Sequence, residues 1–178
     1  MTSIWYEVFP VTLVSKQVAL IRHHREQNFS PWMIPNLPHI HPNEIVVNHL
    51  ATAFGDIFDP GQTIVHSTSW RYENEDDHVI LTYLAVLPQG CWFDKLVTAQ
   101  RICVEPIGAL ETQYGDHLFA PLQLERCNVL AHALDHLASL STYDPAIQAV
   151  LEPEWGEVLR PRLPKSAGCL QRSLNKLL

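Results

Sequence analysis

Apolar residues along this chain recur at two spacings, every second position in some segments and every third or fourth in others, which predicts both strands and helices. Residues 62–72 alternate between side chains of different polarity, and residues 78–87 are apolar at most positions. The acidic sequence ENEDD separates the two segments, as a turn would. We therefore predict a hairpin over residues 62–87 at the centre of a sheet. Further strands are expected at residues 4–9, 17–22 and 99–105.

Two other segments have the periodicity of helices with one buried face. In residues 43–56, Val46, Leu50 and Phe54 share one side, and Asn43 is placed to cap the first turn. Residues 121–140 divide into two opposite arcs. The apolar arc holds Cys127, Leu130, Ala133, Leu134, Leu137 and Ala138, and the polar arc holds Glu125, Asn128, His132, Asp135, His136 and Ser139. The sequence thus predicts an α+β fold, an antiparallel or mixed sheet on which both helices pack.

Residues 26–42 contain four prolines and show no period. We predict a long ordered loop or lid there, covering a cleft near the sheet, because long loops in compact domains are often functional. Shorter helices are expected after Pro145 and around residues 154–160.

The composition is that of a globular protein, with 47% hydrophobic and 17% charged residues in 178 positions. We expect one domain over residues 1–160 and a basic tail or short helix over residues 161–178. The net charge is −7, yet residues 160–178 carry five basic residues and no acidic ones, so the rest of the chain carries −12. This acidic balance argues against a nucleic acid partner. A basic, apolar tail on an acidic body is consistent with a homodimer.

The four cysteines form no CxxC pair, so we expect reduced thiols and neither a zinc knuckle nor a redox motif. No signal peptide pattern and no long apolar run is present, which predicts a cytoplasmic protein without a membrane partner.

Histidines are the first candidates for chemistry. His39 and His41 flank one position in HIHPNE, and His132 and His136 lie one helical turn apart. If the two pairs met, they could bind a divalent transition metal, with Glu44 or Glu125 as the base for a metal-bound water. The competing interpretation is that His132 and His136 belong to a helix face that looks into water. The shared site requires the two pairs to lie within about 10 Å of each other.

The segment HSTSWRYE supplies the second candidate site. Strict alternation would place Ser67, Ser69 and Arg71 on one face, where they could hold a phosphate or carboxylate. Trp70 would lie on the other face, which could stack a ring. A ligand between the 26–42 loop and the hairpin would contact Arg71, Trp70 and Tyr83. The competing interpretation is an edge strand whose serines and arginine face water.

The order strand, strand, helix, hairpin, strand resembles that of Nudix-like domains. The resemblance implies a glutamate-rich REXXEE box on the helix, but residues 42–56 contain only Glu44 and Asp56 as acidic residues. It therefore implies a domain without the usual Mg²⁺-dependent pyrophosphatase chemistry. No P-loop, GxGxxG, GxSxG or SxxK motif is present either.

Three functions stay open at this point. The first is a non-catalytic small-molecule binding or regulatory domain. The second is a metal-dependent hydrolase or related enzyme with a histidine-rich site. The third is a catalytically degenerate Nudix-like domain. The position of the histidine pairs in space discriminates the second from the others.

Overall fold

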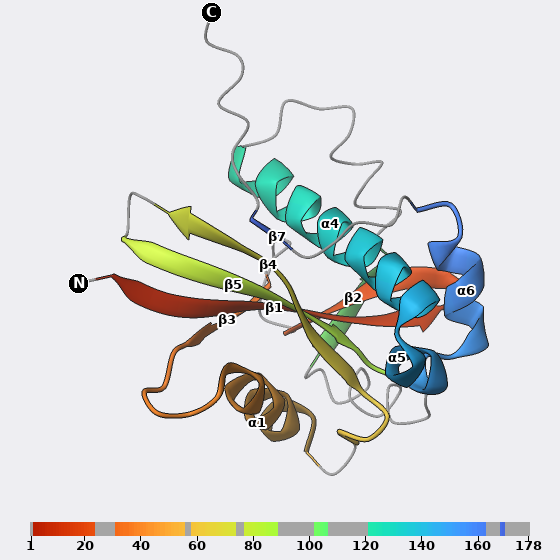
Figure 1. Cartoon of the computed structure of the whole chain (residues 1–178), viewed down its shortest axis with the longest axis horizontal. Helices are drawn as coiled ribbons and strands as arrows, with labels where there is room; N and C mark the ends of the chain where they lie inside the picture. The colour runs from red at the N-terminus through yellow and green to blue at the C-terminus, as the bar shows by residue number, and fades with distance from the viewer. Residues whose placement is uncertain are drawn as a thin grey trace, which may run out of the picture.

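A seven-stranded mixed sheet is the centre of the molecule, with helices on both of its faces (Figure 1). The computed structural model describes residues 2–23, 31–55, 58–73, 77–88, 102–106, 121–162 and 168–169. The strands are β1 (Ser3–Val14), β2 (Gln17–His23), β3 (Trp32–Pro35), β4 (Ile64–Glu73), β5 (His78–Val86), β6 (Ile102–Pro106) and β7 (Gly168–Cys169). Their order is β6-β2-β1-β5-β4-β7, and β3 pairs with β1.

Strand β1 organises the sheet because it is buried without a break from Tyr6 to Leu13. It runs parallel to β5 along one edge. Along its other edge, its first half pairs with β3 and its second half with β2, both antiparallel. Strands β4 and β5 form the predicted hairpin, with Ile64 opposite Val86 and Glu73 opposite His78. The predicted α+β fold with a mixed sheet around this hairpin is confirmed.

The helices are α1 (Pro42–Phe54), α4 (Pro121–Tyr143), α5 (Pro145–Val150) and α6 (Pro153–Leu159). Figure 1 shows α1 on one side of the sheet and α4, α5 and α6 on the other. We call these two sides the α1 face and the α4 face. The predicted cap of α1 at Asn43 is wrong by two positions, because Nδ1 of His41 accepts the Asn43 N–H at 3.3 Å. Asp144 caps α5 with its carboxylate.

Each face of the sheet has its own hydrophobic core. On the α4 face, Phe9 and Leu84 pack with Leu134 and Trp155, all at most 2% exposed. On the α1 face the core gathers residues of β1, β3, β5 and α1. Its buried members are Tyr6, Val8, Ile21, Trp32, Ile34, Ile45, Val46, Leu50, Phe54, Tyr83, Ala85 and Leu87. The two predicted helices therefore use their apolar sides as expected, but on opposite faces.

The predicted loop at residues 26–42 contains a strand, β3. Trp32 and Ile34 are buried while Met33 and Pro35 are exposed, and this alternation over four residues is too short to stand out between prolines. Since β1 lies between β3 and the hairpin, the described part of the loop joins the sheet and does not cover the hairpin. Residues 24–30 lie outside the described part.

Little of the predicted tail at residues 161–178 belongs to the described part of the chain. Its residues Gly168 and Cys169 form β7, which pairs in parallel with Ser69 and Trp70 of β4. Within the described residues, no helix is long and apolar enough to cross a membrane.

Candidate functional site

A β-bulge in β4 decides which of its side chains share a face. Ser67 pairs with Tyr83, but Ser69 pairs with the very next residue of β5, Thr82, so Thr68 is an extra residue. The predicted row of Ser67, Ser69 and Arg71 is therefore wrong. Ser67 lies on the α1 face, whereas Ser69 and Arg71 lie on the α4 face, because the bulge reverses the alternation between them.

Arg71 is held by carboxylates of the protein itself. Its Nη1 and Nη2 donate to the two carboxylate oxygens of Glu7 at 2.5 and 3.0 Å, and its Nε donates to Glu73 at 3.1 Å. Thr82 Oγ1 donates to Glu7 at 3.1 Å, and the Glu7 side chain is fully buried. Burial lowers the pKa of Arg71, but the hydrogen bonds and charges of Glu7 and Glu73 outweigh it and leave the pKa raised. The three guanidinium nitrogens of Arg71 are thus engaged by carboxylates of the protein, and its contact with an anionic ligand stays a prediction.

The sheet separates the two predicted histidine pairs. His39 and His41 are exposed residues just before α1, and His41 is its cap. His132 and His136 belong to α4, on the opposite face (Figure 1). The predicted metal centre shared by all four histidines is therefore wrong. Within the described ranges, no group of three His, Cys, Asp or Glu residues could hold a metal ion.

The polar arc of α4 only partly faces water. His136 is 6% exposed, and its ring centroid lies 5.2 Å from that of His66 in β4. His66 Nδ1 donates to the Ser67 carbonyl at 2.8 Å, which fixes the orientation of its ring. The interpretation of this arc as solvent-facing is thus wrong for His136, because its ring packs against His66 of the sheet. Sequence reasoning missed the partner, His66, although its place in an alternating strand was visible.

The two predicted catalytic glutamates are not part of a described cluster. Glu44 is exposed in the first turn of α1. The side chain of Glu125 lies outside the described part of the chain. No base adjacent to a metal site is therefore formed by the residues that the structure describes.

The α1 face carries an exposed aromatic surface where α1 does not cover it. Cross-strand pairing puts Trp70 beside Leu81 and Tyr72 beside Val79, and these neighbour Tyr6 and Ile4 of β1. Tyr6 belongs to the α1-side core, which identifies the face. Trp70 is 45% and Tyr72 49% exposed. We call Ile4, Trp70, Tyr72, Val79 and Leu81 the aromatic platform.

Tyrosine hydroxyls border the platform. Ser67 hydrogen-bonds to Tyr83, a buried residue whose ring meets that of Tyr6 edge-on at 6.0 Å. Tyr6 donates in turn to Asn36 Oδ1 at 2.5 Å. Burial raises the pKa of both Tyr6 and Tyr83, so both phenols stay neutral. Of the five residues predicted to bind a ligand, Ser67, Trp70 and Tyr83 thus share one face.

A carboxylate stands at the end of the platform. Asp77 Oδ1 accepts hydrogen bonds from Tyr72 at 2.8 Å and from Thr2 at 2.9 Å. These two bonds hold the pKa of Asp77 below its ordinary value. The bond to Asp77 raises the pKa of Tyr72. Sequence reasoning missed Asp77, because only the pairing of β4 with β5 brings this turn residue to Tyr72.

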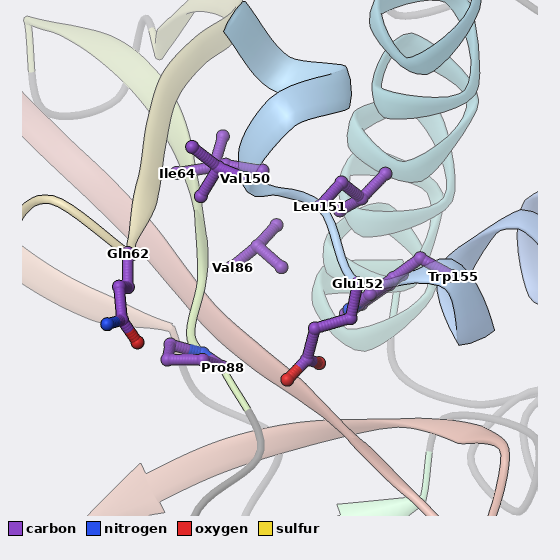
Figure 2. Close-up of a pocket in the computed structure, with 8 residues that line it drawn as sticks. All are labelled: Gln62, Ile64, Val86, Pro88, Val150, Leu151, Glu152 and Trp155. Atoms are coloured by element: carbon purple, nitrogen blue, oxygen red, sulfur yellow. The ribbon is translucent and has the colours of Figure 1, made fainter.

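A small hollow lies elsewhere, between the hairpin and the segment that joins α5 to α6 (Figure 2). Its walls are formed by Gln62, Ile64, Val86, Pro88, Val150, Leu151, Glu152 and Trp155. The volume of about 10 Å³ accommodates a single water molecule and no larger ligand. The aromatic platform is therefore the better candidate for ligand binding.

Comparison with known proteins identifies the fold and no family. No family model and no curated protein sequence matches this chain. The crystal structure of Shewanella oneidensis NrtR complexed with a 27mer DNA is similar at a TM-score of 0.60 and 12% identity, over 90% of this chain and 77% of that one. A second structure of Shewanella oneidensis NrtR has a TM-score of 0.61 and 12% sequence identity, over 91% of this chain and 79% of that one. The crystal structure of the C. elegans Ap4A hydrolase has a TM-score of 0.49 and 11% sequence identity, over 74% of this chain and 96% of that one. The chain has a Nudix-like fold.

Proposed function

We propose that this chain is a catalytically degenerate Nudix-like domain that binds a small molecule on its aromatic platform without hydrolysing it. The main support for the absence of hydrolysis is the composition of the exposed side of α1. Glu44 is its one carboxylate, and the positions one and two turns later are the exposed neutral residues Asn48 and Thr52. The Thr52 hydroxyl donates to the Asn48 carbonyl at 2.8 Å, so it is engaged with its own helix. A lone carboxylate does not fit a site for Mg²⁺, which needs several oxygen ligands in octahedral geometry.

Two further observations support binding without catalysis. The two predicted histidine pairs lie on opposite faces of the sheet, so they cannot bind one metal ion together. The platform exposes two large aromatic side chains, Trp70 and Tyr72, next to each other on one strand face. Exposed aromatic clusters of this kind are typical of binding sites.

We expect no turnover of pyrophosphate-containing nucleotides by the purified protein. The measurement is release of phosphate or nucleoside monophosphate from dinucleoside polyphosphates and nucleoside diphosphate derivatives, with Mg²⁺ or Mn²⁺ present. Glu44→Gln is the matched control, because it removes the one carboxylate of α1 and leaves its buried side intact. Wild type and Glu44→Gln should give the same background rate.

Turnover that Glu44→Gln abolishes would overturn the proposal in favour of a metal-dependent hydrolase. Turnover that persists equally in both proteins would come from a contaminating enzyme or from a site without Glu44. A repeat with protein purified through a second, independent route separates these two sources.

Duplex DNA is a partner to test, because NrtR, which shares the fold, was crystallised with a 27mer. We expect this chain not to bind duplex DNA at physiological salt, since its net charge of −7 opposes a phosphate backbone. The measurement is fluorescence anisotropy of a labelled 27-base-pair duplex across a salt series, the length being that of the NrtR complex. Binding that weakens steeply with salt would show that a basic segment engages phosphates, and the proposed function would become that of a DNA-binding regulator.

A further inference from the structure

The layer between α4 and the sheet contains two histidines that meet ring to ring. His66 of β4 and His136 of α4 have their ring centroids 5.2 Å apart, with the ring planes inclined at 54°. His136 is 6% exposed and His66 is partly buried. The hydrogen bond from His66 Nδ1 to the Ser67 carbonyl holds the His66 ring in place against its partner. The contact between α4 and the sheet therefore includes a pair of groups that titrate near neutral pH.

Two positive charges do not fit into this contact. Burial disfavours the charged form of an imidazole, because the charge loses its contact with water. A second positive charge at the distance between these rings adds a repulsion, which is stronger inside a protein than in water. With α4 on the sheet, the pair can therefore hold one proton, mainly on the more exposed His66. With α4 released into water, both rings can be protonated below about pH 6.5.

The neighbours of His136 on α4 do not supply a counter-charge for a second proton. His132 lies one turn earlier, and its Nε2 atom is buried without a hydrogen-bond partner among the described residues. Protonation of His132 would add positive charge on the same side of the helix. Asp135 is the adjacent carboxylate, and it accepts a hydrogen bond at 3.3 Å from Arg162, whose positive charge offsets its own.

The sheet residues on the α4 face do not supply one either. The carboxylates of Glu7 and Glu73 are both bonded to Arg71, which lies five positions beyond His66 on β4. On β5, His78 is the ionisable side chain on this face. It pairs with Glu73 at the far end of the hairpin and hydrogen-bonds to Ser3 at 2.7 Å. The ionisable groups that the sheet presents near Arg71 are thus already paired with one another.

The two short helices that pack on α4 complete its surroundings. Helix α5 has no ionisable side chain, and its cap Asp144 accepts hydrogen bonds from the backbone of α5 itself. In α6, Glu157 bonds to Lys16 at 3.2 Å, and Glu154 is exposed to water. Glu152, just before α6, lines the small hollow of Figure 2. Every other described carboxylate around α4 is therefore bonded to a cation, to backbone N–H groups or to water.

We propose that the contact between His66 and His136 is a pH switch, which keeps α4 on the sheet at neutral pH and releases it as the pH falls below about 6.5. The released state binds one more proton than the packed state. Acidification therefore shifts the equilibrium toward release by about tenfold per pH unit. The inference goes beyond the proposed binding function and does not depend on the aromatic platform, which lies on the other face of the sheet.

Hydrogen–deuterium exchange of the full-length protein tests the proposal between about pH 7.5 and about pH 5.5, the range in which imidazoles titrate. The rates are divided by the intrinsic rate at each pH, so that the protection of each helix is compared directly. We expect the protection of α4 to fall by about tenfold per pH unit below pH 6.5. The protection of α1 should stay constant, because α1 packs on the opposite face of the sheet (Figure 1).

Two variants connect this pH dependence to the histidine pair. His136→Phe keeps an aromatic ring that cannot be protonated, so the protection of α4 should no longer depend on pH. His66→Gln removes one of the two charges and keeps a polar group on the sheet, so the dependence should become weaker than in the wild type. His39→Asn is the control. His39 is exposed before α1 at a φ of 69°, a conformation that asparagine tolerates, and the variant should behave like the wild type.

Each remaining outcome decides the proposal. Protection of α4 that does not change with pH in the wild type would overturn the switch. An equal loss of protection in α1 would show unfolding of the whole domain and would overturn the release of α4. The full wild-type dependence in His136→Phe would assign the effect to another group. The full dependence in His66→Gln would assign it to the burial of His136 alone, and this variant decides the role of the pair even if His136→Phe does not fold.

Discussion

Arg71→Ala is expected to reduce the free energy of unfolding by about 3–5 kcal/mol, because it leaves the carboxylate of Glu7 buried without its counter-charge. The Glu7 side chain is fully buried and that of Arg71 is 17% exposed, so water can do little to replace the guanidinium. A loss of this size is a large fraction of the stability of an ordinary domain. Urea denaturation at pH 7, followed by circular dichroism, measures it.

The double variant Glu7→Leu/Arg71→Met is the control for this prediction. Replacing both ions of a buried pair by apolar residues of similar size is often neutral, so the double variant should recover most of the stability that Arg71→Ala loses. If Arg71→Ala instead unfolds like the wild type but loses affinity for an anionic ligand, Arg71 is a ligand-binding residue. The bidentate pair with Glu7 would then be dispensable.

Leu134→Ala is expected to destabilise the protein by about 2–5 kcal/mol, because it leaves a cavity between α4 and the sheet. Leu134 is completely buried in the α4-side core with Phe9 and Leu84. Side chains of both the sheet and α4 surround Leu134, so the neighbouring residues cannot move far enough to fill the cavity. Urea denaturation again gives the free energy, and an unchanged m-value would show that the unfolded state is not affected.

Leu37→Ala is the matched control, since it makes the same chemical change at a leucine that is 48% exposed. We expect it to cost less than about 0.5 kcal/mol. If Leu134→Ala were as mild as Leu37→Ala, α4 would not be packed on the sheet as described. His66 and His136 would then not be in contact either.

Comparison of the predicted and observed sites shows what local patterns can and cannot reveal. Trp70, Ser67 and Tyr83 were recognisable as candidate ligand contacts, because aromatic and hydroxyl residues alternate there in a strand. Ser69 and Arg71 were placed on the same face as Ser67 for the same reason, and the extra residue Thr68 makes that placement wrong. A bulge has no reliable signature in a single sequence, so the faces beyond it could not be predicted.

The sequence by itself determined the secondary structure of the hairpin and of all four described helices, since the periodicity of apolar residues and the capping residues act over a few neighbouring positions. It also determined that α1 lacks the acidic residues of a Nudix box. Only the tertiary structure decided the partners. Glu7 and Arg71 are 64 positions apart, and His66 of β4 meets His136 of α4 between the sheet and that helix. Such pairs depend on strand order, register and the helix that covers each face, which local sequence does not encode. The same dependence separates the four candidate metal-binding histidines and leaves Trp70, Tyr72 and Asp77 together at one end of the sheet.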